Sequence, residues 1–276
     1  MRLRSLLFVP GDRPDRFARA VASGADALIL DLEDAVVTAR KAEARAAVRA
    51  YLAPPRPGKE LLVFVRVNPL DSPFLDDDLA ALADARPDGL VLPKAAGARD
   101  VLRLAERLAL PILPVATETP AAIFALGSYG QAAAHLAGLT WGAEDLPAAI
   151  GAAAAREADG GYTDPYRLAR SLALFAAHAA GVPAIETVYP DFRDMDGLAA
   201  YAARGRRDGF TGMLAIHPAQ VAVINAAFTP SADELAQARR VVALFAANPD
   251  AGALQLDGRM VDAPHLKAAQ RLLARA

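Results

Sequence analysis

Short apolar segments alternate along the chain with longer, alanine-rich segments in which charged residues recur at helical spacing. The apolar segments are nearly continuous, which is typical of parallel strands that are buried on both faces. The predicted strands are Ser5–Val9, Ala27–Leu30, Leu61–Val65, Gly89–Leu92, Ile112–Ala116, Ala137–Trp141, Ala184–Val188 and Leu214–Ile216. The predicted helices between them include Arg13–Ser23, Ala39–Leu52, Asp77–Ala85, Ala98–Leu108, Thr119–Phe124, Pro165–Ala180 and Gly197–Arg207.

Eight strand–helix units over roughly 215 residues predict a TIM (β/α)8 barrel, a fold that usually takes ~200–250 residues. An open, doubly wound α/β sheet is the alternative. That fold commonly has a Gly-x-Gly-x-x-Gly phosphate loop after an early strand, and the stretch from Pro10 to Pro14 does not match it. We therefore expect a catalytic barrel over residues 1–230.

The last part of the chain, residues 231–276, has a different pattern. Ser231 and Glu234 form a capping box that begins a helix. Asp257-Gly258 then separates two short apolar segments, as in a two-residue β-hairpin, and a final helix follows Pro264. We expect a C-terminal helix–hairpin–helix extension that acts as a lid or packs on a neighbouring subunit.

Composition narrows the range of partners and sites. The 276 residues are 54% hydrophobic with a net charge of −2, so no basic surplus indicates a nucleic-acid partner. Cysteine is absent, which excludes disulfides, thiolate chemistry and cysteine zinc sites, and is compatible with a reducing compartment. The N-terminal sequence does not match a signal peptide, and no apolar run is long enough to span a bilayer. We expect a cytoplasmic enzyme that binds neither nucleic acid nor membrane.

Charged and polar groups cluster where the predicted strands end. In a barrel these ends meet at one face, where active sites form. Any one cluster is also consistent with a helix cap or a solvated loop, but their repetition at one end of nearly every strand favours a shared site. The clusters are Asp31-Leu32-Glu33-Asp34, Arg66-Val67-Asn68, Pro93-Lys94, Thr117-Glu118-Thr119-Pro120, Gly142-Ala143-Glu144-Asp145, Tyr189-Pro190-Asp191 and His217-Pro218.

Carboxylates dominate these clusters, and the ligand spacing of His–Cys metal sites is missing. Oxygen ligands favour a hard cation, Mg²⁺ or Mn²⁺, and Mg²⁺ usually takes one or two protein carboxylates. Glu118 and Asp145 are the best pair, because they follow adjacent predicted strands that hold them rigidly. Each of the two also has a structural alternative as an N-terminal helix cap.

Two cationic residues at the strand ends have both a functional and a structural interpretation. Arg66 ends a buried strand and needs an anion there, either a substrate carboxylate or an acidic residue of the segment Asp31–Asp34. Lys94 is either a Schiff-base lysine, as in metal-independent aldolases, or, more commonly, an ion-pair partner. His217 is expected to be a structural, hydrogen-bonding histidine, and Trp141 to belong to the core.

With these residues the chain resembles the HpcH/HpaI aldolase/citrate lyase family, and within it the citrate lyase β-subunit-like (CitE-like) branch of acyl-CoA lyases. The resemblance covers essentially the whole chain and is strongly specific for the family but weakly specific for one substrate. It rests on segments in a fixed order: Leu7-Phe8-Val9-Pro10-Gly11, Asp31-Leu32-Glu33-Asp34, Arg66-Val67-Asn68, Leu92-Pro93-Lys94, Glu118-Thr119-Pro120, Gly142-Ala143-Glu144-Asp145-Leu146 and Ile216-His217-Pro218-Ala219-Gln220.

The resemblance implies a TIM barrel with Mg²⁺ held by Glu118 and Asp145, and with Mn²⁺ as a possible substitute. It implies that Arg66 and Glu118 act on the substrate acid, and that Gly142 and Ala143 line its site. The residues implied to lie near the metal waters, or to pair with arginines, are Asp31, Glu33, Asp34 and Lys94. The residues implied to meet the nucleotide tail of coenzyme A are Gly11 and Arg13.

The C-terminal segment Met260-Val261-Asp262-Ala263-Pro264 resembles the lid motif of malyl-CoA and citramalyl-CoA lyases, in which an aspartate from a neighbouring subunit completes the active site. Asp262 occupies that position and is therefore implied to be catalytic; its alternative role is to cap the final helix. The family usually forms homotrimers, or hexamers built from trimers. Relatives often carry Lys before the final strand where this chain has Met213, which would alter tail or carboxylate contacts.

The implied reaction is a Claisen-type cleavage of a 3-hydroxyacyl thioester, such as citryl-, malyl- or citramalyl-CoA, into a 2-oxo acid and an acyl thioester. Asp262 would protonate the thioester enolate, or deprotonate the acetyl group in the reverse direction. Three alternatives are a malyl-CoA thioesterase on the same site, a Schiff-base aldolase on Lys94, and a non-catalytic subunit of a citrate lyase-like complex with an acyl-carrier subunit. The sequence leaves open the acyl group, the carrier of the thioester and the physiological direction.

Overall fold

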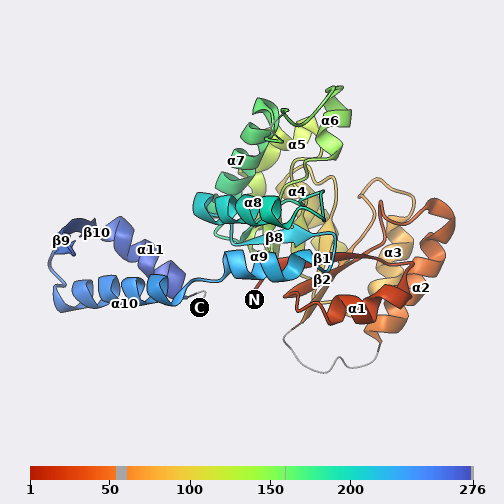
Figure 1. Ribbon diagram of the computed structural model, residues 1–276. Coiled ribbons are helices and arrows are strands. Elements are labelled where there is room, and N and C mark those ends of the chain that lie inside the picture. The colour runs from red at the N-terminus through yellow and green to blue at the C-terminus, as the bar shows by residue number, and fades with distance from the viewer. Residues whose placement is uncertain (54–60, 159, 275–276) are drawn as a thin grey trace. The chain divides into compact units, whose positions relative to one another are not determined.

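The computed structural model describes residues 1–53, 61–158 and 160–274. Contacts divide the chain into two compact units, one formed mainly by Leu3–Ala226 and the other mainly by Ala227–Ala276. The first unit holds a parallel sheet surrounded by helices (Figure 1), and the second holds two helices and a hairpin.

Eight parallel strands form the sheet of the first unit, in the order β5-β4-β3-β2-β1-β8-β7-β6. Two isolated parallel bridges, Ile112↔Leu136 and Val115↔Thr140, join the two edges of this sheet. The sheet thus closes on itself, which confirms the predicted TIM barrel over the open-sheet alternative. The strands are β1 (Ser5–Pro10), β2 (Ala27–Asp31), β3 (Leu62–Arg66), β4 (Gly89–Leu92), β5 (Ile112–Pro114), β6 (Leu139–Thr140), β7 (Ala184–Glu186) and β8 (Gly212–Ala215).

Helices connect the strands and pack on the outside of the barrel, as the right-handed β–α–β crossover requires. They are α1 (Phe17–Val21), α2 (Lys41–Leu52), α3 (Leu75–Leu82), α4 (Ala98–Arg107), α5 (Pro120–Ala125), α6 (Asp145–Ile150), α7 (Asp164–Ala179), α8 (Met195–Asp208) and α9 (Gln220–Phe228). Short 3-10 segments precede α1 and α2, and a longer one covers Leu126–His135.

The barrel interior is filled by alternate residues of the strands. The buried cluster contains Leu6, Ile29, Phe64, Val91, Leu113, Ile185 and Leu214, one from each of seven strands. Gly89 belongs to this interior because the ring of Phe64 occupies the space that a Cβ atom would need there. A solid apolar interior means that the fold can present chemistry only at the ends of its strands.

The structure corrects the predicted elements in three places. Met213 lies inside β8 and is fully buried, so it does not precede the last strand. The 3-10 segment Leu126–His135 and helix α9 were not among the predicted helices. The 3-10 segment has few charged residues and two glycines, so it carries little helical periodicity.

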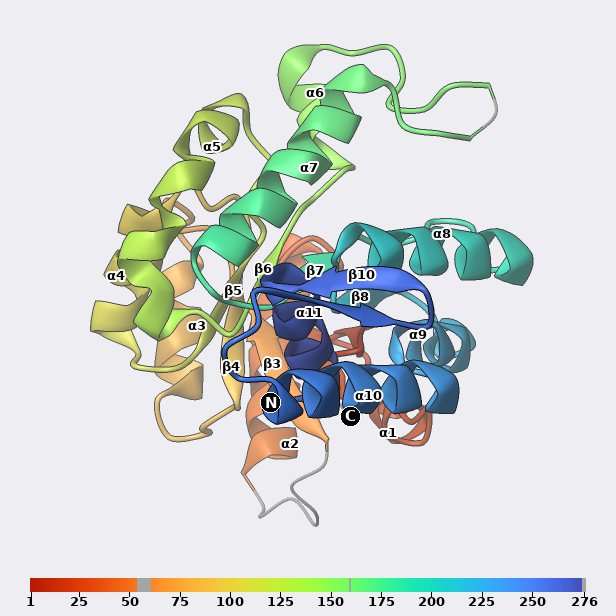
Figure 2. The ribbon, with the colours of Figure 1, turned by 90° about the vertical axis from the view of Figure 1, so that its left-hand side faces the viewer.

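The second unit has the predicted helix–hairpin–helix order (Figure 2). Ser231 and Glu234 cap α10 (Ala232–Ala247) reciprocally. The strands β9 (Ala253–Leu256) and β10 (Arg259–Asp262) pair antiparallel, and α11 (Ala263–Leu273) follows directly. Asp257 and Gly258 have φ of 50° and 77°, the positive values that a type I′ turn needs, which explains glycine at the second position.

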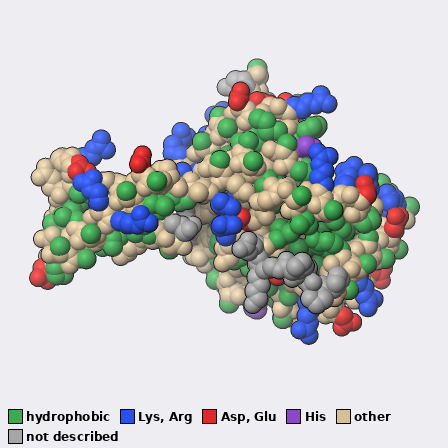
Figure 3. Space-filling view, turned by 60° about the horizontal axis from the view of Figure 1, so that its bottom comes forward, with side chains coloured by type: hydrophobic (Ala, Val, Ile, Leu, Met, Phe, Trp, Pro, Cys, Tyr) green, Lys and Arg blue, Asp and Glu red, His purple; other side chains and the backbone are tan. Residues whose placement is uncertain are grey.

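Among the described residues, no helix combines the length and apolar character needed to cross a lipid bilayer. On the face of the molecule shown in Figure 3, acidic and basic side chains are scattered singly or in small groups and do not form one large patch of a single sign.

Candidate active site

The strand register brings the predicted polar clusters together at one end of the barrel. Asp31, the last residue of β2, is directly paired in register with Arg66, the last residue of β3. Lys94 and Glu118 follow β4 and β5, and the Lys94 backbone N–H donates to Glu118 Oε2 at 2.5 Å. The ends of β2 to β6 therefore form a continuous row of ionisable side chains.

Arg66 is paired with acidic residues of the predicted cluster. Its Nε and Nη2 donate to the two carboxylate oxygens of Asp31, at 2.7 and 2.6 Å, and its guanidinium lies over the ring of Phe8. Nη1 lies 3.0 Å from Glu33 Oε2, an oxygen that has no hydrogen-bond partner among the described residues. Burial lowers the pKa of Arg66, but the bond to Asp31 and the nearby carboxylates outweigh it and raise the pKa above its ordinary value. In this structure Arg66 therefore pairs with acidic residues of the segment Asp31–Asp34, as the structural interpretation expected. Its Nη1 retains N–H donors for a substrate carboxylate.

Lys94 is an ion-pair partner in this structure. Its Nζ donates to Glu33 Oε1 at 2.7 Å and lies 3.9 Å from Asp34. Burial lowers the pKa of Lys94, but the hydrogen bond to Glu33 and the charges of Glu33 and Asp34 raise it more, so the amine stays protonated. A Schiff-base lysine needs a lowered pKa, and this environment therefore disfavours the aldolase interpretation.

Glu118 and Asp145 form a pair of carboxyl groups in hydrogen-bond contact. Burial, the hydrogen bond with Asp145 and the negative charge of Asp145 raise the pKa of Glu118 to about 8. Neither residue is an N-cap, because Thr119 caps α5 through its side chain and Glu144 precedes α6. Two carboxyl groups this close hold a proton between them or need a cation.

This pair fits a hard divalent cation. It offers two carboxylate groups, one of them in contact with the Lys94 backbone, and Mg²⁺ commonly takes one or two carboxylates and fills its other positions with water and substrate oxygens. Among the described residues no three His, Cys, Asp or Glu side chains form a complete metal cage. The arrangement therefore suits a cation shared with substrate better than a closed structural site.

Thr117 and Gly142 lock the two carboxylates into position, and the sequence did not single out Thr117. Its hydroxyl donates to the Gly142 carbonyl at 2.9 Å and accepts from the Gly142 N–H at 3.0 Å. A Cβ atom on Gly142 would lie only 2.6 Å from Cγ of Glu118. The Glu118 side chain therefore fits only if residue 142 is a glycine. Ala143, which is also buried, connects Gly142 to the segment that carries Asp145.

Replacing Gly142 by Ala is expected to displace Glu118 and to lower kcat/KM about tenfold to a hundredfold, because misplacing a reactive group by about 1 Å has that order of effect. The melting temperature should fall only slightly. Steady-state assays and thermal unfolding check this. Ala143→Gly, at the adjacent position, is the control and should change kcat/KM far less; equal losses in both variants would contradict the proposed clash.

The first loop lies against the end of β2. The Gly11 N–H donates to the Asp31 carbonyl at 2.8 Å, and a Cβ atom on Gly11 would lie 2.6 Å from that oxygen. Arg13 pairs with Asp15 at the surface. Arg40, which the sequence did not single out, pairs with Asp12 at 2.8 Å and adds a second cation to this loop.

Lys41 is a further residue that sequence reasoning missed. Its Nζ donates to the carbonyls of Leu32 and Glu33, at 2.8 and 3.2 Å, and lies over the Phe74 ring. Burial lowers the pKa of Lys41. Lys41 holds the acidic loop after β2 in place. The one sequence feature that could have drawn attention to it is the rarity of lysine, since the chain has only four.

Asp262 belongs to the second unit, where it is the N-cap residue of α11. Its Oδ1 lies 2.5 Å from Nδ1 of His265, which lowers the pKa of Asp262. The structure thus shows the capping role, and an exposed carboxylate in that position is also free to meet a substrate. His265 carried no signal in the sequence.

Glu186, at the end of β7, is the centre of a buried network beside the site. Its Oε1 accepts from Trp141 Nε1 at 2.5 Å and from the Tyr201 hydroxyl at 3.0 Å, and its Oε2 pairs with Arg170. Trp141 is fully buried, as predicted. Met213, on β8, is in register with Glu186 on β7, so it lies next to this network.

His217 has a structural role, as predicted. Its Nδ1 accepts from the Ala219 N–H at 3.2 Å, and its ring stacks on Phe192. Gln220 bonds the backbone of both Ile216 and His217 and donates to the Tyr189 carbonyl. These contacts tie the end of β8 to the loop after β7.

Comparisons with known proteins agree with this geometry. The model of the HpcH/HpaI aldolase/citrate lyase family matches residues 4–218. A citrate lyase subunit beta-like protein of Mycobacterium tuberculosis is 41% identical over 271 residues, which cover 98% of this chain and 94% of the relative. A (3S)-malyl-CoA thioesterase of Cereibacter sphaeroides is 36% identical over 281 residues, which cover 99% of this chain and 94% of the relative.

A solved structure gives the same result. The crystal structure of protein CitE from Mycobacterium tuberculosis, in complex with magnesium, acetoacetate and coenzyme A, aligns with a TM-score of 0.84 and 38% sequence identity. The alignment covers 99% of this chain and 97% of the other. The barrel, the ordered strand-end segments and these full-length matches together show that the chain belongs to the HpcH/HpaI aldolase/citrate lyase family.

Proposed function

We propose that this protein is a magnesium-dependent carbon–carbon lyase that acts on a 3-hydroxyacyl thioester such as citryl-, malyl- or citramalyl-CoA. The observation that carries the proposal is the pair of buried Glu118 and half-buried Asp145, at the same strand ends as Arg66, on a barrel whose relative of known structure binds magnesium, acetoacetate and coenzyme A. The products are a 2-oxo acid and an acyl thioester.

Each residue of the row has a part in this reaction. Glu118 and Asp145 would hold the cation, which would supply charge stabilisation for the negatively charged oxygens of the substrate. Arg66, fixed by Asp31, donates from Nη1 to the substrate carboxylate and sets the orientation of the breaking bond. Glu33 and Lys94 keep the charges around this cleft balanced.

In the cleavage direction the 3-hydroxyl gives its proton to solvent water, the bond between C2 and C3 breaks, and C3 becomes the carbonyl carbon of the 2-oxo acid. The electron pair of that bond forms the thioester enolate. We assign to Asp262 the proton that then joins C2, or its removal in the reverse reaction. Met260, two residues before Asp262, is 66% exposed, as expected of a segment that packs on another surface in the assembly.

Replacing Asp262 by Asn is expected to lower kcat about 10²–10⁴-fold, the usual contribution of a general acid or base. Folding should be retained, because Asn is also a good N-cap residue. Steady-state assays measure the loss. His265→Gln is the matched control on the same helix turn and should lose much less activity; full activity of the Asn variant would assign Asp262 to capping alone.

A mixing experiment tests whether Asp262 acts on a neighbouring subunit. Differently tagged Glu118→Gln and Asp262→Asn chains are co-expressed and the mixed oligomers isolated. If the lid serves a neighbour, about a quarter of the sites in a randomly mixed cyclic oligomer combine two intact halves, and activity returns. If each lid serves its own barrel, every site carries one defect and the mixture stays inactive.

The direct test of the function is an assay of the purified protein with citryl-, malyl- and citramalyl-CoA, with and without Mg²⁺. Release of oxaloacetate, glyoxylate or pyruvate that EDTA abolishes supports the proposal. The (3S)-malyl-CoA thioesterase relative makes hydrolysis the second candidate. Free malate without glyoxylate would identify a thioesterase, and full activity in EDTA with borohydride trapping on Lys94 would overturn the metal-dependent reaction.

The proposed assembly is a homotrimer, or a hexamer built from two trimers, in the cytoplasm, with coenzyme A as the thioester carrier. A carrier-protein thioester is the alternative, because a citrate lyase subunit beta of Haemophilus influenzae is 32% identical over nearly the full chain. Sedimentation and the acceptance of CoA thioesters by the isolated protein decide between these possibilities.

A further inference from the structure

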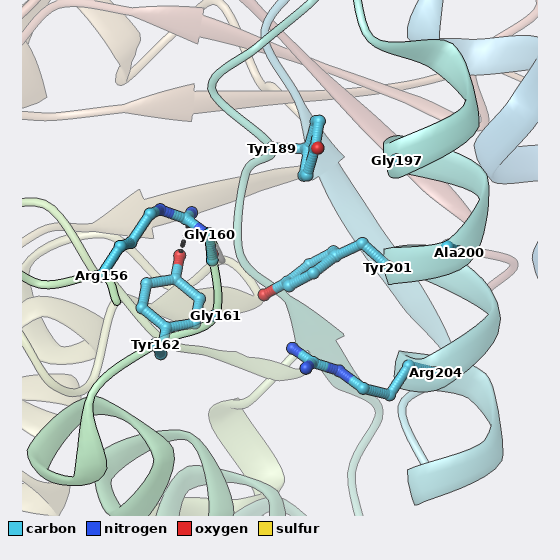
Figure 4. A pocket seen from close by; sticks show the side chains of 9 residues that line it. All are labelled: Arg156, Gly160, Gly161, Tyr162, Tyr189, Gly197, Ala200, Tyr201 and Arg204. Carbon is cyan, nitrogen blue, oxygen red and sulfur yellow. Dashed lines mark hydrogen bonds between the residues drawn. The ribbon is translucent and has the colours of Figure 1, made fainter. Parts of the chain in front are cut away.

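A second cavity lies in the first unit, away from the row of strand-end carboxylates. It has a volume of about 350 Å³, within the size range of small-ligand sites. The loop before α7 forms one wall with Arg156, Gly160, Gly161 and Tyr162 (Figure 4), and Tyr189 and α8 form the others. The α8 residues are Gly197, Ala200, Tyr201 and Arg204.

In the part of the chain that the structure describes, two guanidinium groups approach this cavity without a carboxylate in hydrogen-bond contact. Arg156 donates to the Gly160 carbonyl at 2.9 Å and to the Tyr162 hydroxyl at 2.8 Å, both uncharged groups. Nε of Arg204 is buried and has no hydrogen-bond partner in the part of the chain that the structure describes. Leaving a buried donor unpaired is unfavourable, and an acceptor in the cavity would remove this penalty.

Nearby acids do not neutralise these arginines. Glu186, reached by the Tyr201 hydroxyl, is paired with Arg170. Asp194 accepts from the Tyr189 hydroxyl at 2.6 Å and from the Gly197 N–H at 2.9 Å, and it does not line the cavity. Among the described residues that line the cavity, the charged side chains are the two arginines, so this lining is positively charged.

The cavity also has aromatic walls. Arg156 stacks 4.1 Å from the Tyr162 ring, and Arg204 lies 5.1 Å from the Tyr201 ring, which holds both planar groups in place. The rings of Tyr189 and Tyr201 are 5.7 Å apart. Rigid rings beside two fixed cations suit a ligand with a strong anionic group on a small apolar or planar body.

We propose that this cavity binds a phosphate monoester between Arg156 and Arg204. Such a group carries close to two negative charges near pH 7 and three acceptor oxygens, so one group balances both guanidiniums, whereas one carboxylate balances only one. The tyrosine rings pack against the organic part of the ligand. The site is distinct from the Glu118–Asp145 pair and does not depend on the lyase proposal.

The single tryptophan of the chain provides a readout. Trp141 contacts Tyr162 edge to face, with ring centroids 5.2 Å apart. A ligand that moves Tyr162 therefore changes Trp141 fluorescence excited at 295 nm. The probes are phenyl phosphate and inorganic phosphate, and calorimetry measures their affinity independently of the fluorescence.

We expect saturable binding of phenyl phosphate that Arg204→Gln and Arg156→Gln each weaken about tenfold or more, the loss of one charge-assisted hydrogen bond. Arg207→Gln, an exposed position on the same helix, is the matched control and should leave the affinity unchanged. Glu118→Gln should also bind normally, which separates this site from the lyase site. Arg204→Lys keeps the charge if the Gln variant folds poorly.

Two sources of a phosphate monoester are then compared. If CoA binds more weakly to Arg204→Gln while dephospho-CoA binds both proteins alike, the ligand is the 3′-phosphate of the thioester carrier. If neither responds while phenyl phosphate does, the ligand is a separate phosphorylated metabolite. Absence of phosphate binding at millimolar concentration overturns the proposal. A change of oligomeric state in Arg204→Gln, without any effect on phosphate binding, also overturns it, because the cavity would then be filled by a carboxylate of a second copy of the chain.

Discussion

Glu118→Gln should abolish saturable Mg²⁺ binding and lower kcat/KM by about 10²–10³-fold or more, the order of effect expected when an electrostatic group of the transition state is lost. Glutamine keeps the volume of the side chain and an oxygen that accepts from the Lys94 N–H. It removes the negative charge that Glu118 shares with Asp145 toward a cation. Calorimetric titration with Mg²⁺ and steady-state assays measure the two effects.

The fold should not suffer from this change. Burial and Asp145 raise the pKa of Glu118 to about 8 in the metal-free protein, so the folded state binds a proton that the unfolded chain has lost. The resulting free-energy penalty for folding builds up as the pH rises from the ordinary pKa of a glutamate to about pH 8, and it remains in full above that pH. Glutamine removes the penalty, so the metal-free variant should unfold at the same or a higher temperature near pH 7. A lower melting temperature together with lost activity would instead indicate a structural role.

A matched control lies in the same cluster. Glu144 is exposed and precedes α6, next to Asp145, and Glu144→Gln removes one negative charge without touching Glu118. It should keep Mg²⁺ binding within a small factor. Equal losses in both variants would show that the site responds to net charge rather than to ligation by Glu118.

Glu186→Ala should destabilise the barrel by about 3–5 kcal/mol, the usual cost of removing one partner of a buried ion pair. Glu186 is completely buried, and its removal leaves the Trp141 indole N–H and the Tyr201 hydroxyl without this acceptor and takes from Arg170 one of its two carboxylate partners, the other being Asp208. Urea unfolding followed by far-ultraviolet circular dichroism measures the loss.

The surface ion pair of Arg167 and Asp164 provides the comparison. Both side chains are largely exposed and 3.5 Å apart, so Asp164→Ala should leave the free energy of unfolding nearly unchanged. If Glu186→Ala lowered the free energy of unfolding as little as Asp164→Ala, water would have to solvate the groups that Glu186 leaves unpaired. The network would then not stabilise the end of β7.

The barrel was predictable because its strands are buried on both faces and therefore appear as continuous apolar runs. All eight predicted strands overlap observed ones, from β1 to β8. The hairpin turn at Asp257-Gly258 was equally clear, because positive φ selects for glycine. The 3-10 segment Leu126–His135 was missed, since a stretch with so few charged residues shows no alternation between a polar and an apolar face.

At the site, the position of residues after the predicted strands indicated which side chains lie at the same end of the barrel. It did not indicate which of these side chains form ion pairs or hydrogen bonds with each other. Arg66 had two possible partners from the sequence, and the register of β2 with β3 decided for Asp31. Thr117 gave no signal, because a threonine at a strand end is common, and its role arises only from reaching Gly142 on the adjacent strand.

The sequence alone determined the barrel, the end of the barrel that carries the chemistry, and the family, because hydrophobic periodicity and the order of strand-end motifs are properties of the chain itself. The tertiary structure decided the partners: Asp31 for Arg66, Glu33 for Lys94, and Asp145 for Glu118. It also revealed the cavity lined by Arg156 and Arg204, which come from segments separated by helix α7 and strand β7. The physical reason is that burial depends on local pattern, whereas the energy of a charge depends on groups brought beside it from distant parts of the chain when the barrel closes.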